Sequence, residues 1–309
     1  MLVVISAMAG YIDNNHCQLG VSDMQQLMLN YGEDLQFAFF FGCLFIFLII
    51  ERLAPERRVA RSQHRRWRTN SALTILAILV LPLLPVTFIT AGYWAQENDF
   101  GLLNNLPVEL PIWAIALATL LLRGFISFFT HLLNHRLPFL WRLHRVHHMD
   151  TELDVSSTVR FHPLEMPVSM IIGLPMIALL GLSPWALLFY ELFDASIVVF
   201  SHSNISLPAK LERVLRYIIV TPDLHKVHHS AFQPETDSNF SAVFPVWDII
   251  FGTFRTQTVE PLSTMPLGIE EVGSEKAEDF IWLLSSPFRT LAQASDNPGQ
   301  GPVRVVPHE

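Results

Sequence analysis

Ten histidines between positions 131 and 229 restrict the fold and the chemistry of this chain more than any other feature of its sequence. The chain contains 13 histidines in all, so most of them are concentrated in about a third of its 309 residues. They form one HxxxH motif, two HxxHH motifs and two single positions. The residues are His131 and His135; His144, His147 and His148; His225, His228 and His229; and the single residues His162 and His202.

The spacing within the three motifs predicts metal binding. Residues three and four positions apart lie on the same face of a helix, so each motif directs two or three imidazole rings toward one place. Neutral imidazole is a common ligand for iron, zinc, copper and nickel. A single histidine is more often an ordinary core or surface residue, but three such motifs together predict a histidine-rich metal site. Ten imidazoles are too many for one metal ion, so we expect two ions with four or five nitrogen ligands each.

The composition predicts an integral membrane protein. Hydrophobic residues make up 51% of the chain and charged residues only 16%, whereas soluble domains contain roughly 25% charged residues. The mean hydropathy is +0.36. The net charge of −8 gives no indication of nucleic-acid binding. Two cysteines, Cys17 and Cys43, form no CxxC motif, so the metal ligands should be nitrogen and oxygen atoms rather than sulfur.

The hydrophobic residues fall into four stretches that contain few or no charges, at residues 35–50, 69–96, 111–133 and 166–200. We expect the first three to cross the bilayer, the second of them kinked at Pro82 and Pro85. The fourth is interrupted by glycine and proline, and we expect a helical hairpin that enters and leaves on the cytoplasmic side. The predicted fold is therefore an all-α integral membrane protein with about four to five hydrophobic helices and a cytoplasmic histidine-rich helical cap.

Loop charges predict the orientation of these helices. Residues 51–70 contain seven arginines and directly follow the first hydrophobic stretch. A short loop rich in arginine beside a membrane span lies on the cytoplasmic side. Residues 97–109 carry three acidic and no basic residues, and we expect this loop outside. Counting spans then returns the HxxxH motif to the cytoplasm, so all histidine motifs should lie at the cytoplasmic membrane surface.

Three charged residues lie within the hydrophobic stretches. Arg123 is costly in lipid and should therefore face other parts of the protein. Glu191 and Asp194 in the fourth stretch are candidate partners for its guanidinium group. We interpret these three residues as structural rather than catalytic.

The order HxxxH, HxxHH, HxxHH among hydrophobic stretches resembles the fatty acid hydroxylase/sterol desaturase superfamily, and in particular its bacterial branch. The resemblance extends from about Glu51 to Phe254. It predicts a domain over residues 35–260, preceded by an N-terminal segment (1–34) and followed by a C-terminal tail (261–309). The other segments that carry the resemblance are ERLAPERR at 51–58, RFHPLE at 160–165, FSHSN at 200–204, TPDLHKVHHS at 221–230 and WDIIFGTF at 247–254.

This resemblance implies a membrane-bound non-haem di-iron oxygenase that acts on lipid C–H bonds. The ten histidines would hold two iron ions, and O₂ would be the co-substrate. Hydroxylation is our first expectation and desaturation our second, because hydroxylation requires only one hydrogen abstraction. Relatives act on sterols, fatty acyl chains, sphingoid bases, alkyl glycerols and carotenoids. The chain has no recognisable haem, flavin or NAD motif, so we expect a separate electron-donor protein, and a bacterial inner membrane with the site facing the cytoplasm.

Several polar residues near the motifs are candidates for orienting the metal-binding rings. Asn239 is the strongest, because DSNF resembles the D-x-N-aromatic pattern of the family, although Ser241 stands where relatives often have glycine. Asp223 and Asp237 are the next choices. Three further acidic residues are nearby, Asp150, Asp154 and Glu165.

Two other classes of protein could carry so many histidines. A membrane zinc hydrolase is one alternative, but the chain has no HExxH motif. A metal transporter is the other, but transporter ligands usually lie near the middle of the bilayer on broken helices. Here the histidines lie at the ends of hydrophobic stretches and in the polar segments beyond them, which favours an enzyme site at the membrane surface.

The predicted orientation can be tested by cysteine labelling in intact cells. In a background without Cys17 and Cys43, a single cysteine placed between residues 97 and 109 should react with a membrane-impermeant maleimide added from outside. A cysteine near residue 150 or 235 should react only after the membrane is permeabilised, because the histidine motifs face the cytoplasm. External labelling near residue 150 or 235 would contradict this orientation.

Overall fold

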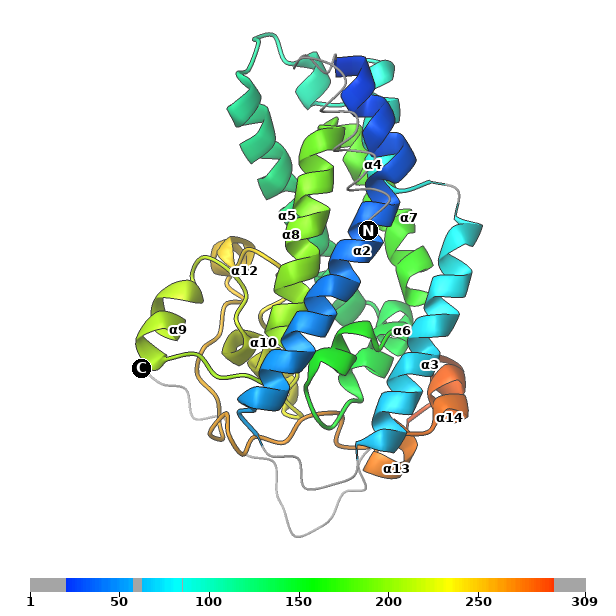
Figure 1. The fold of residues 1–309 in the computed structure, drawn as a ribbon. Helices are drawn as coiled ribbons and strands as arrows, with labels where there is room; N and C mark the ends of the chain where they lie inside the picture. The colour runs from blue at the N-terminus through cyan, green and yellow to red at the C-terminus, as the bar shows by residue number, and fades with distance from the viewer. Residues whose placement is uncertain (1–20, 58–62, 85, 292–309) are drawn as a thin grey trace.

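The structure is a computed structural model that describes residues 21–57, 63–84 and 86–291 (Figure 1). In these residues it contains helices and no strand, with one isolated bridge between Ser230 and Leu267. The all-α prediction is therefore confirmed. The longer helices are α2 (Val21–Leu53), α3 (His64–Val80), α4 (Phe88–Glu97), α5 (Ile112–Arg136), α6 (Pro138–His148), α7 (Glu165–Leu180) and α8 (Pro184–His202). The shorter ones are α9 (Ala209–Leu215), α10 (Pro222–His228), α11 (Gln233–Thr236), α12 (Val246–Phe251), α13 (Ser274–Ala277) and α14 (Phe280–Ser285).

Three of the described helices are long and apolar enough to cross a membrane. They are the part of α2 from Asp34 to Leu53, the whole of α5 and the whole of α8. Helix α7 is apolar but has only 16 residues, so it is shorter than the roughly 20 residues that span a bilayer. This is a membrane protein, as the composition predicted.

The second hydrophobic stretch is broken rather than kinked. Helix α3 ends at Val80 and continues into a 3-10 turn, Leu81–Leu83, which contains Pro82. Helix α4 then begins at Phe88, where Thr87 and Thr90 exchange side-chain and backbone hydrogen bonds in a capping box. Pro85 lies outside the described residues. The N-terminal cap at Thr87 explains why α4 begins as a separate helix.

The fourth stretch forms the expected helical hairpin. Helix α7 ends at Leu180 and is followed by Gly181, whose φ of 65° is the left-handed conformation that glycine adopts without strain. Helix α8 begins only three residues later with Pro184 in its first turn. A side chain at Gly181 would also meet the carbonyl oxygen of Phe100 at 3.0 Å. Position 181 therefore requires glycine for two reasons, the left-handed backbone conformation and the lack of space beside the Phe100 carbonyl oxygen.

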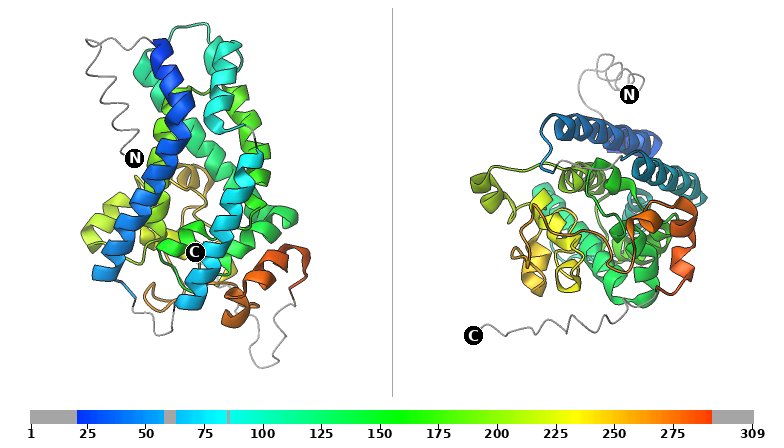
Figure 2. Two further views of the ribbon diagram at one scale, coloured as in Figure 1. Left: turned by 45° about the vertical axis from the view of Figure 1, so that its right-hand side comes forward. Right: turned by 90° about the horizontal axis from the view of Figure 1, so that it is seen from below.

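Helix α8 lies at the centre of the membrane part and packs against α2, α4 and α5. The shorter helices gather around the lower ends of the long ones in Figure 1. Seen from below in Figure 2, α9 to α12 lie on one side and α13 and α14 on the other. The histidine-bearing segments, on α5, α6, α8 and α10, meet at one end of the hydrophobic helices.

The C-terminal segment is packed against the rest of the protein up to Leu291. Val272, Ala277 and Leu283 are buried against Leu73 of α3 and Val146 of α6. The described part of the segment that was expected to be a tail is therefore packed, and the domain boundary at residue 260 stays a prediction. Residues 292–309 lie outside the described part.

The charged residues in the hydrophobic helices form an ion pair. Arg123 Nε donates to Glu191 Oε1 at 2.7 Å, and both side chains are buried. The guanidinium group also lies over the rings of Phe88 and Tyr190, at 4.4 and 5.0 Å from their centroids. Of the two predicted partners, Glu191 therefore makes the direct contact. The pair joins α5 to α8 at a level where lipid could not solvate either charge.

Replacing Arg123 with methionine should destabilise the protein by about 3 kcal/mol, because Glu191 would remain buried without its partner. The double variant Arg123→Met, Glu191→Met should recover much of this loss. Thermal unfolding of the detergent-solubilised protein measures both. Arg68→Met, at an exposed position, is the matched control. Equal unfolding temperatures for Arg123→Met and the wild type would show that the pair does not stabilise the fold.

Candidate metal centre

Nine of the ten clustered histidines form two groups whose ring nitrogens converge. In each group, one possible ligand atom from every member lies within 4.8 Å of all the others. The first histidine group contains His131, His135, His144, His148 and His228. The second histidine group contains His147, His202, His225 and His229.

Each HxxHH motif contributes to both groups. On α6, His144 and His148 are one helical turn apart and join the first group, while His147 joins the second. On α10 and the residue that follows it, His225 and His229 join the second group and His228 joins the first. The motif thus places two rings on one side of a helix and the third beside them. The two groups are therefore neighbours, with the His148 and His229 ring centroids 4.6 Å apart.

Hydrogen bonds fix the orientation of several rings through Nδ1. His131 Nδ1 lies 2.7 Å from the Phe240 carbonyl oxygen, and His228 Nδ1 lies 2.7 Å from that of Ser238. A carbonyl oxygen can only accept, so each of these Nδ1 atoms carries the proton. His144 Nδ1 is held in the same way by Glu165, at 2.6 Å. In a neutral ring the other nitrogen, Nε2, is then left with a free lone pair.

These free lone pairs point at one another. The Nε2 atom of His131 lies 2.9 Å from that of His144 and 3.1 Å from that of His228. Since all three Nδ1 atoms carry the proton, neutral rings have no proton to share between these Nε2 atoms. A metal–nitrogen bond of about 2.1 Å would place neighbouring ligands about 3.0–3.4 Å apart. The two distances therefore fit two edges of a metal coordination shell, and the first histidine group fits a metal ion.

The second histidine group has the same spacing. The Nε2 atom of His202 lies 3.2 Å from that of His147 and 3.0 Å from that of His225. His229 Nε2 lies 3.1 Å from His225 Nε2. His202 Nδ1 donates to the Val198 carbonyl oxygen at 2.7 Å, so its Nε2 is also free. Four nitrogens thus converge here, against five in the first group.

Burial keeps the rings outside the membrane spans neutral. It lowers the pKa of His147, His148, His225 and His229 well below the usual value, and the neighbouring imidazoles add to this effect. Burial also lowers the pKa of His228 to about 3. Neutral imidazole is the form that binds metal ions. At pH 7 these histidines are therefore ready to act as ligands without first losing a proton.

Two of the predicted orienting residues contact a ring. Asp237 Oδ1 lies 3.3 Å from His135 Nδ1, while His135 Nε2 is buried without a partner. Glu165 holds His144, as described above. A carboxylate behind a metal-binding histidine fixes its tautomer and raises its basicity. Both acids therefore suit rings whose Nε2 atoms face a metal.

Asn239 acts on the site through the backbone rather than through a ring. Its φ is 53°, and its side chain donates to the carbonyl oxygens of Leu224 and Arg255 and accepts from the Arg255 N–H. This turn directs the carbonyls on either side of Asn239, those of Ser238 and Phe240, to His228 and His131. The sequence therefore pointed to a residue that shapes the site, but in the described structure the Asn239 side chain bonds to backbone atoms and not to a histidine ring.

The sequence analysis did not identify Asp248 as a residue that supports the site. Its carboxylate accepts from the backbone N–H groups of Phe240 and Ser241, at 2.7 and 2.9 Å. It thereby holds the same turn from the other side. The signal was present in the sequence, as the single acidic residue within the apolar WDIIF segment.

Two predicted residues lie away from the converging nitrogens. His162 Nε2 lies 3.2 Å from the Leu284 carbonyl oxygen and its Nδ1 accepts from the Leu164 N–H, so both ring nitrogens already have protein partners. His162 is in neither group. Asp223 lies in the first turn of α10 and makes no contact with a histidine ring, while Thr221 caps that helix. In the described structure these two residues do not join the converging nitrogens, and their roles as metal ligand and orienting residue stay predictions.

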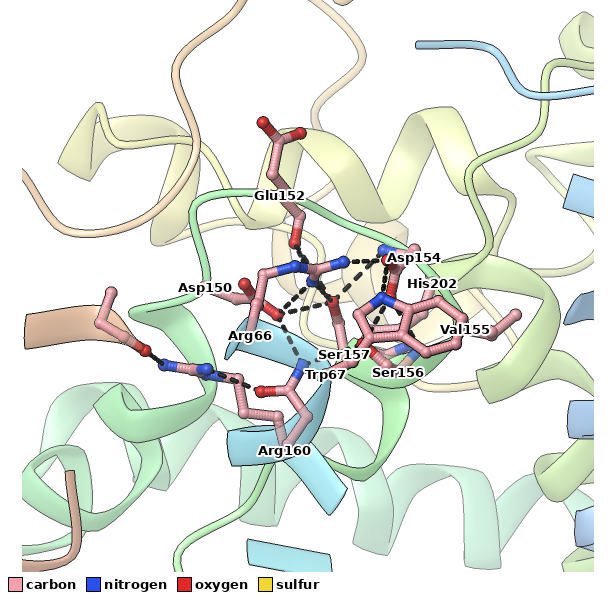
Figure 3. Close-up of polar contacts among 12 residues, drawn as sticks. Arg66, Trp67, Asp150, Glu152, Asp154, Val155, Ser156, Ser157, Arg160 and His202 are labelled. Carbon is pink, nitrogen blue, oxygen red and sulfur yellow. Dashed lines mark hydrogen bonds and ion pairs between the residues drawn. The ribbon is translucent and has the colours of Figure 1, made fainter. Parts of the chain in front are cut away.

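A buried polar network around Arg66 (Figure 3) holds the chain that follows α6, the helix that carries His147 and His148. Asp150 accepts from Arg66 at 2.9 Å and from Ser157 at 2.8 Å, and Arg66 also pairs with Asp154. Arg160 Nε donates to the Val146 carbonyl oxygen at 2.9 Å. Arg66 is one of the seven arginines at residues 51–70 that predict the membrane orientation. It is also a buried residue that stabilises the fold.

The lower end of α2 is tied to the second histidine group. Glu51 Oε2 accepts from the Asn204 N–H at 3.2 Å, and Arg57 and Asn204 exchange backbone and side-chain hydrogen bonds at 3.0 and 2.9 Å. Glu56 pairs with Lys226, which lies between His225 and His228 in the sequence. The ERLAPERR segment therefore anchors the residues on either side of the second group.

Comparison with known proteins agrees with this geometry. Residues 116–253 match the profile of the fatty acid hydroxylase family. The ornithine lipid hydroxylase OlsE of Rhizobium tropici is 26% identical over 271 residues, which cover 86% of this chain and 77% of the relative. A cholesterol 25-hydroxylase-like protein of Danio rerio is 31% identical over 219 residues, covering 68% of this chain and 84% of the relative.

Human alkylglycerol monooxygenase is 26% identical over 254 residues, or 76% of this chain. The chain spans only about half of that relative, with 54% of its length covered. No solved structure matches the chain significantly.

Replacing His228 with alanine should remove one of the five nitrogens of the first group, weaken metal binding there and lower the metal content below the expected two ions per chain. His162→Ala should retain both ions, because His162 lies outside the groups. Plasma mass spectrometry of the purified protein measures the content, with the exposed His64→Ala as control. A full metal content in His228→Ala would remove this residue from the ligand set.

Proposed function

Because this chain belongs to the fatty acid hydroxylase family and is thus an oxidoreductase that acts on a lipid, we propose that it is a membrane-bound non-haem di-iron enzyme. It uses O₂ to hydroxylate a C–H bond of a membrane lipid. The observation that carries the proposal is the pair of neighbouring histidine groups, whose nitrogens converge at the spacing of a metal coordination shell. Bound iron would supply the activation of O₂ for attack on an unactivated C–H bond.

The protein's own residues would hold the two ions and keep the site dry. The nine rings supply only nitrogen atoms, and seven of them are fully buried. Phe161 stacks on His147 with 4.7 Å between ring centroids. Phe240 lies 5.0 Å from the His135 ring. These apolar neighbours exclude water from the metal-binding rings.

An aromatic row connects the first histidine group with the outer surface of α5 and α12. Phe240 contacts Phe128, and Phe128 stacks on Phe251 with 5.3 Å between centroids. Phe251 is exposed, whereas Phe128 and Phe240 are fully buried. Since α5 is a candidate membrane span, this row faces lipid at its outer end. It supports an approach of the substrate from the bilayer.

The named relatives support hydroxylation over desaturation, since all three are hydroxylases or monooxygenases by name. They give no support to a zinc hydrolase or a metal transporter. In hydroxylation, one oxygen atom of O₂ enters the lipid and the other leaves as water, which takes up two electrons and two protons. We propose that a separate electron-donor protein supplies these electrons on the cytoplasmic side of a bacterial inner membrane. The bacterial origin of one relative and the arginine-rich loop support this location.

The proposal is tested with purified, iron-loaded protein, a reductant, total bacterial lipid extract and oxygen-18 gas. We expect a lipid product that is heavier by one labelled oxygen atom. His147→Ala should yield no product, because it removes one of four nitrogens from the second group, while His64→Ala should remain active. A product lighter by two hydrogen atoms and without label would indicate desaturation instead. No turnover of any lipid by the iron-loaded protein would contradict the enzyme assignment.

A further inference from the structure

A polar cleft of about 520 Å³ lies beside the first histidine group. Its volume is within the range of about 300–1,000 Å³ typical of ligand sites. It is formed by the end of α5, the turn before Asn239 and the segment that follows α12. Its lining residues include Arg136, Pro234, Asp237, Ser238 and the run 252–257.

The inner wall of this cleft touches two rings of the first histidine group. Asp237 lies 3.3 Å from His135 Nδ1, and the Ser238 carbonyl oxygen accepts from His228 Nδ1 at 2.7 Å. A molecule held in the cleft would therefore lie directly behind two of the five ligand rings. The cleft adjoins the reaction site without being part of the metal centre.

The charges at the cleft favour an anion. Arg136 is exposed at the end of α5, and the described residues form no ion pair with it. Arg255 is held in place because its Nε donates to the Gln257 carbonyl oxygen and its Nη1 to that of Pro234. The one acid of the lining, Asp237, faces His135. Two guanidinium groups thus remain for a phosphate or a carboxylate, which arginine binds through paired hydrogen bonds.

The outer edge of the cleft continues into an apolar surface. Gly252 of the lining directly follows α12, where Ile249, Ile250 and Phe251 are exposed. Helix α12 lies against the candidate span α5, with Phe251 and Phe125 stacked at 6.0 Å between centroids. These apolar side chains therefore face the hydrocarbon of the bilayer. A polar, basic cleft beside a lipid-facing helix suits a molecule with an anionic head and an apolar tail.

We propose that this cleft binds the anionic headgroup of the lipid substrate, a phosphate or carboxylate, while the lipid's apolar chains lie along α12. The inference rests on the proposed function and narrows it to an anionic lipid.

The first experiment measures binding without turnover. Native mass spectrometry compares retention of phosphatidylglycerol, phosphatidylcholine and inorganic phosphate by the full-length protein in detergent. We expect phosphatidylglycerol to be retained in preference to the other two, and Arg136→Glu to weaken its retention about tenfold, about 1.4 kcal/mol. Arg142→Glu is the matched control, because Arg142 is an equally exposed arginine six positions away that does not line the cleft.

Three outcomes of this experiment would overturn the proposal. Equal retention of phosphatidylglycerol and phosphatidylcholine would show that the headgroup charge is not recognised. Equal retention by Arg136→Glu and the wild type would exclude the cleft. Phosphate bound as tightly as phosphatidylglycerol would indicate a site for the free anion rather than for a lipid.

The second experiment uses turnover to locate the substrate. The lipid extract is separated into anionic and neutral fractions before the oxygen-18 reaction. We expect label in the anionic fraction, and we expect Arg136→Glu to raise KM about tenfold while kcat stays close to the wild-type value. Label confined to the neutral fraction would overturn the headgroup site but keep the hydroxylase assignment. Retention of phosphatidylglycerol without any turnover would contradict the hydroxylase assignment and leave the binding result in favour of the cleft.

The same assay separates a lipid site from a docking site for an acidic redox protein. The turnover measurements are made with dithionite, a small reductant, and repeated with a ferredoxin as donor. A defect of Arg136→Glu that persists with dithionite supports the lipid site. A defect seen only with the ferredoxin would assign the cleft to the donor and overturn the proposal.

Discussion

The structure depends on one constraint, the convergence of nine imidazole nitrogens, several of which face one another as lone pairs that neutral rings cannot satisfy. Lone pairs held about 3 Å apart repel unless a cation lies between them. The fold therefore has to force them together, and it does so from several sides. Carbonyl groups and carboxylates fix the rings through Nδ1, the Arg66 network fixes the end of α6, and the end of α2 anchors the segments around His202 and Lys226. Metal binding would repay this arrangement, since it stabilises only the folded protein.

The membrane supplies the second condition. Long apolar helices can present histidines at their ends, where the chain leaves the hydrocarbon, without burying unsatisfied polar groups in lipid. The ends of α5 and α8 do this directly. The site is consequently bounded by lipid-facing helices on one side and by the short polar helices on the other. A lipid can reach such a site from the bilayer, while the polar cleft on its flank provides an anchor for a headgroup.

Much of the fold and of the metal centre could be predicted because the signals are local. Hydropathy located two of the three candidate spans, those in α2 and α5, and the HxxxH and HxxHH spacings gave the shared helix faces. The failures concern contacts between distant segments. His162 has the same side chain as the nine converging histidines, but its neighbours Leu164 and Leu284 take both ring nitrogens. Asn239 was selected for the right turn, yet its effect passes through backbone carbonyls, which a pattern of side chains does not reveal.

The sequence by itself determined that the chain is helical, enters a membrane and carries imidazoles grouped for metal binding, because periodicity and composition act over a few neighbouring residues. Only the tertiary structure decided how each HxxHH motif divides its rings between the two groups. It also decided that the segment from Ile269 to Leu291 packs against α3 and α6, and that a basic cleft adjoins His135 and His228. These features require elements far apart in the chain to meet, and the side-chain packing that brings them together has no counterpart in local sequence spacing.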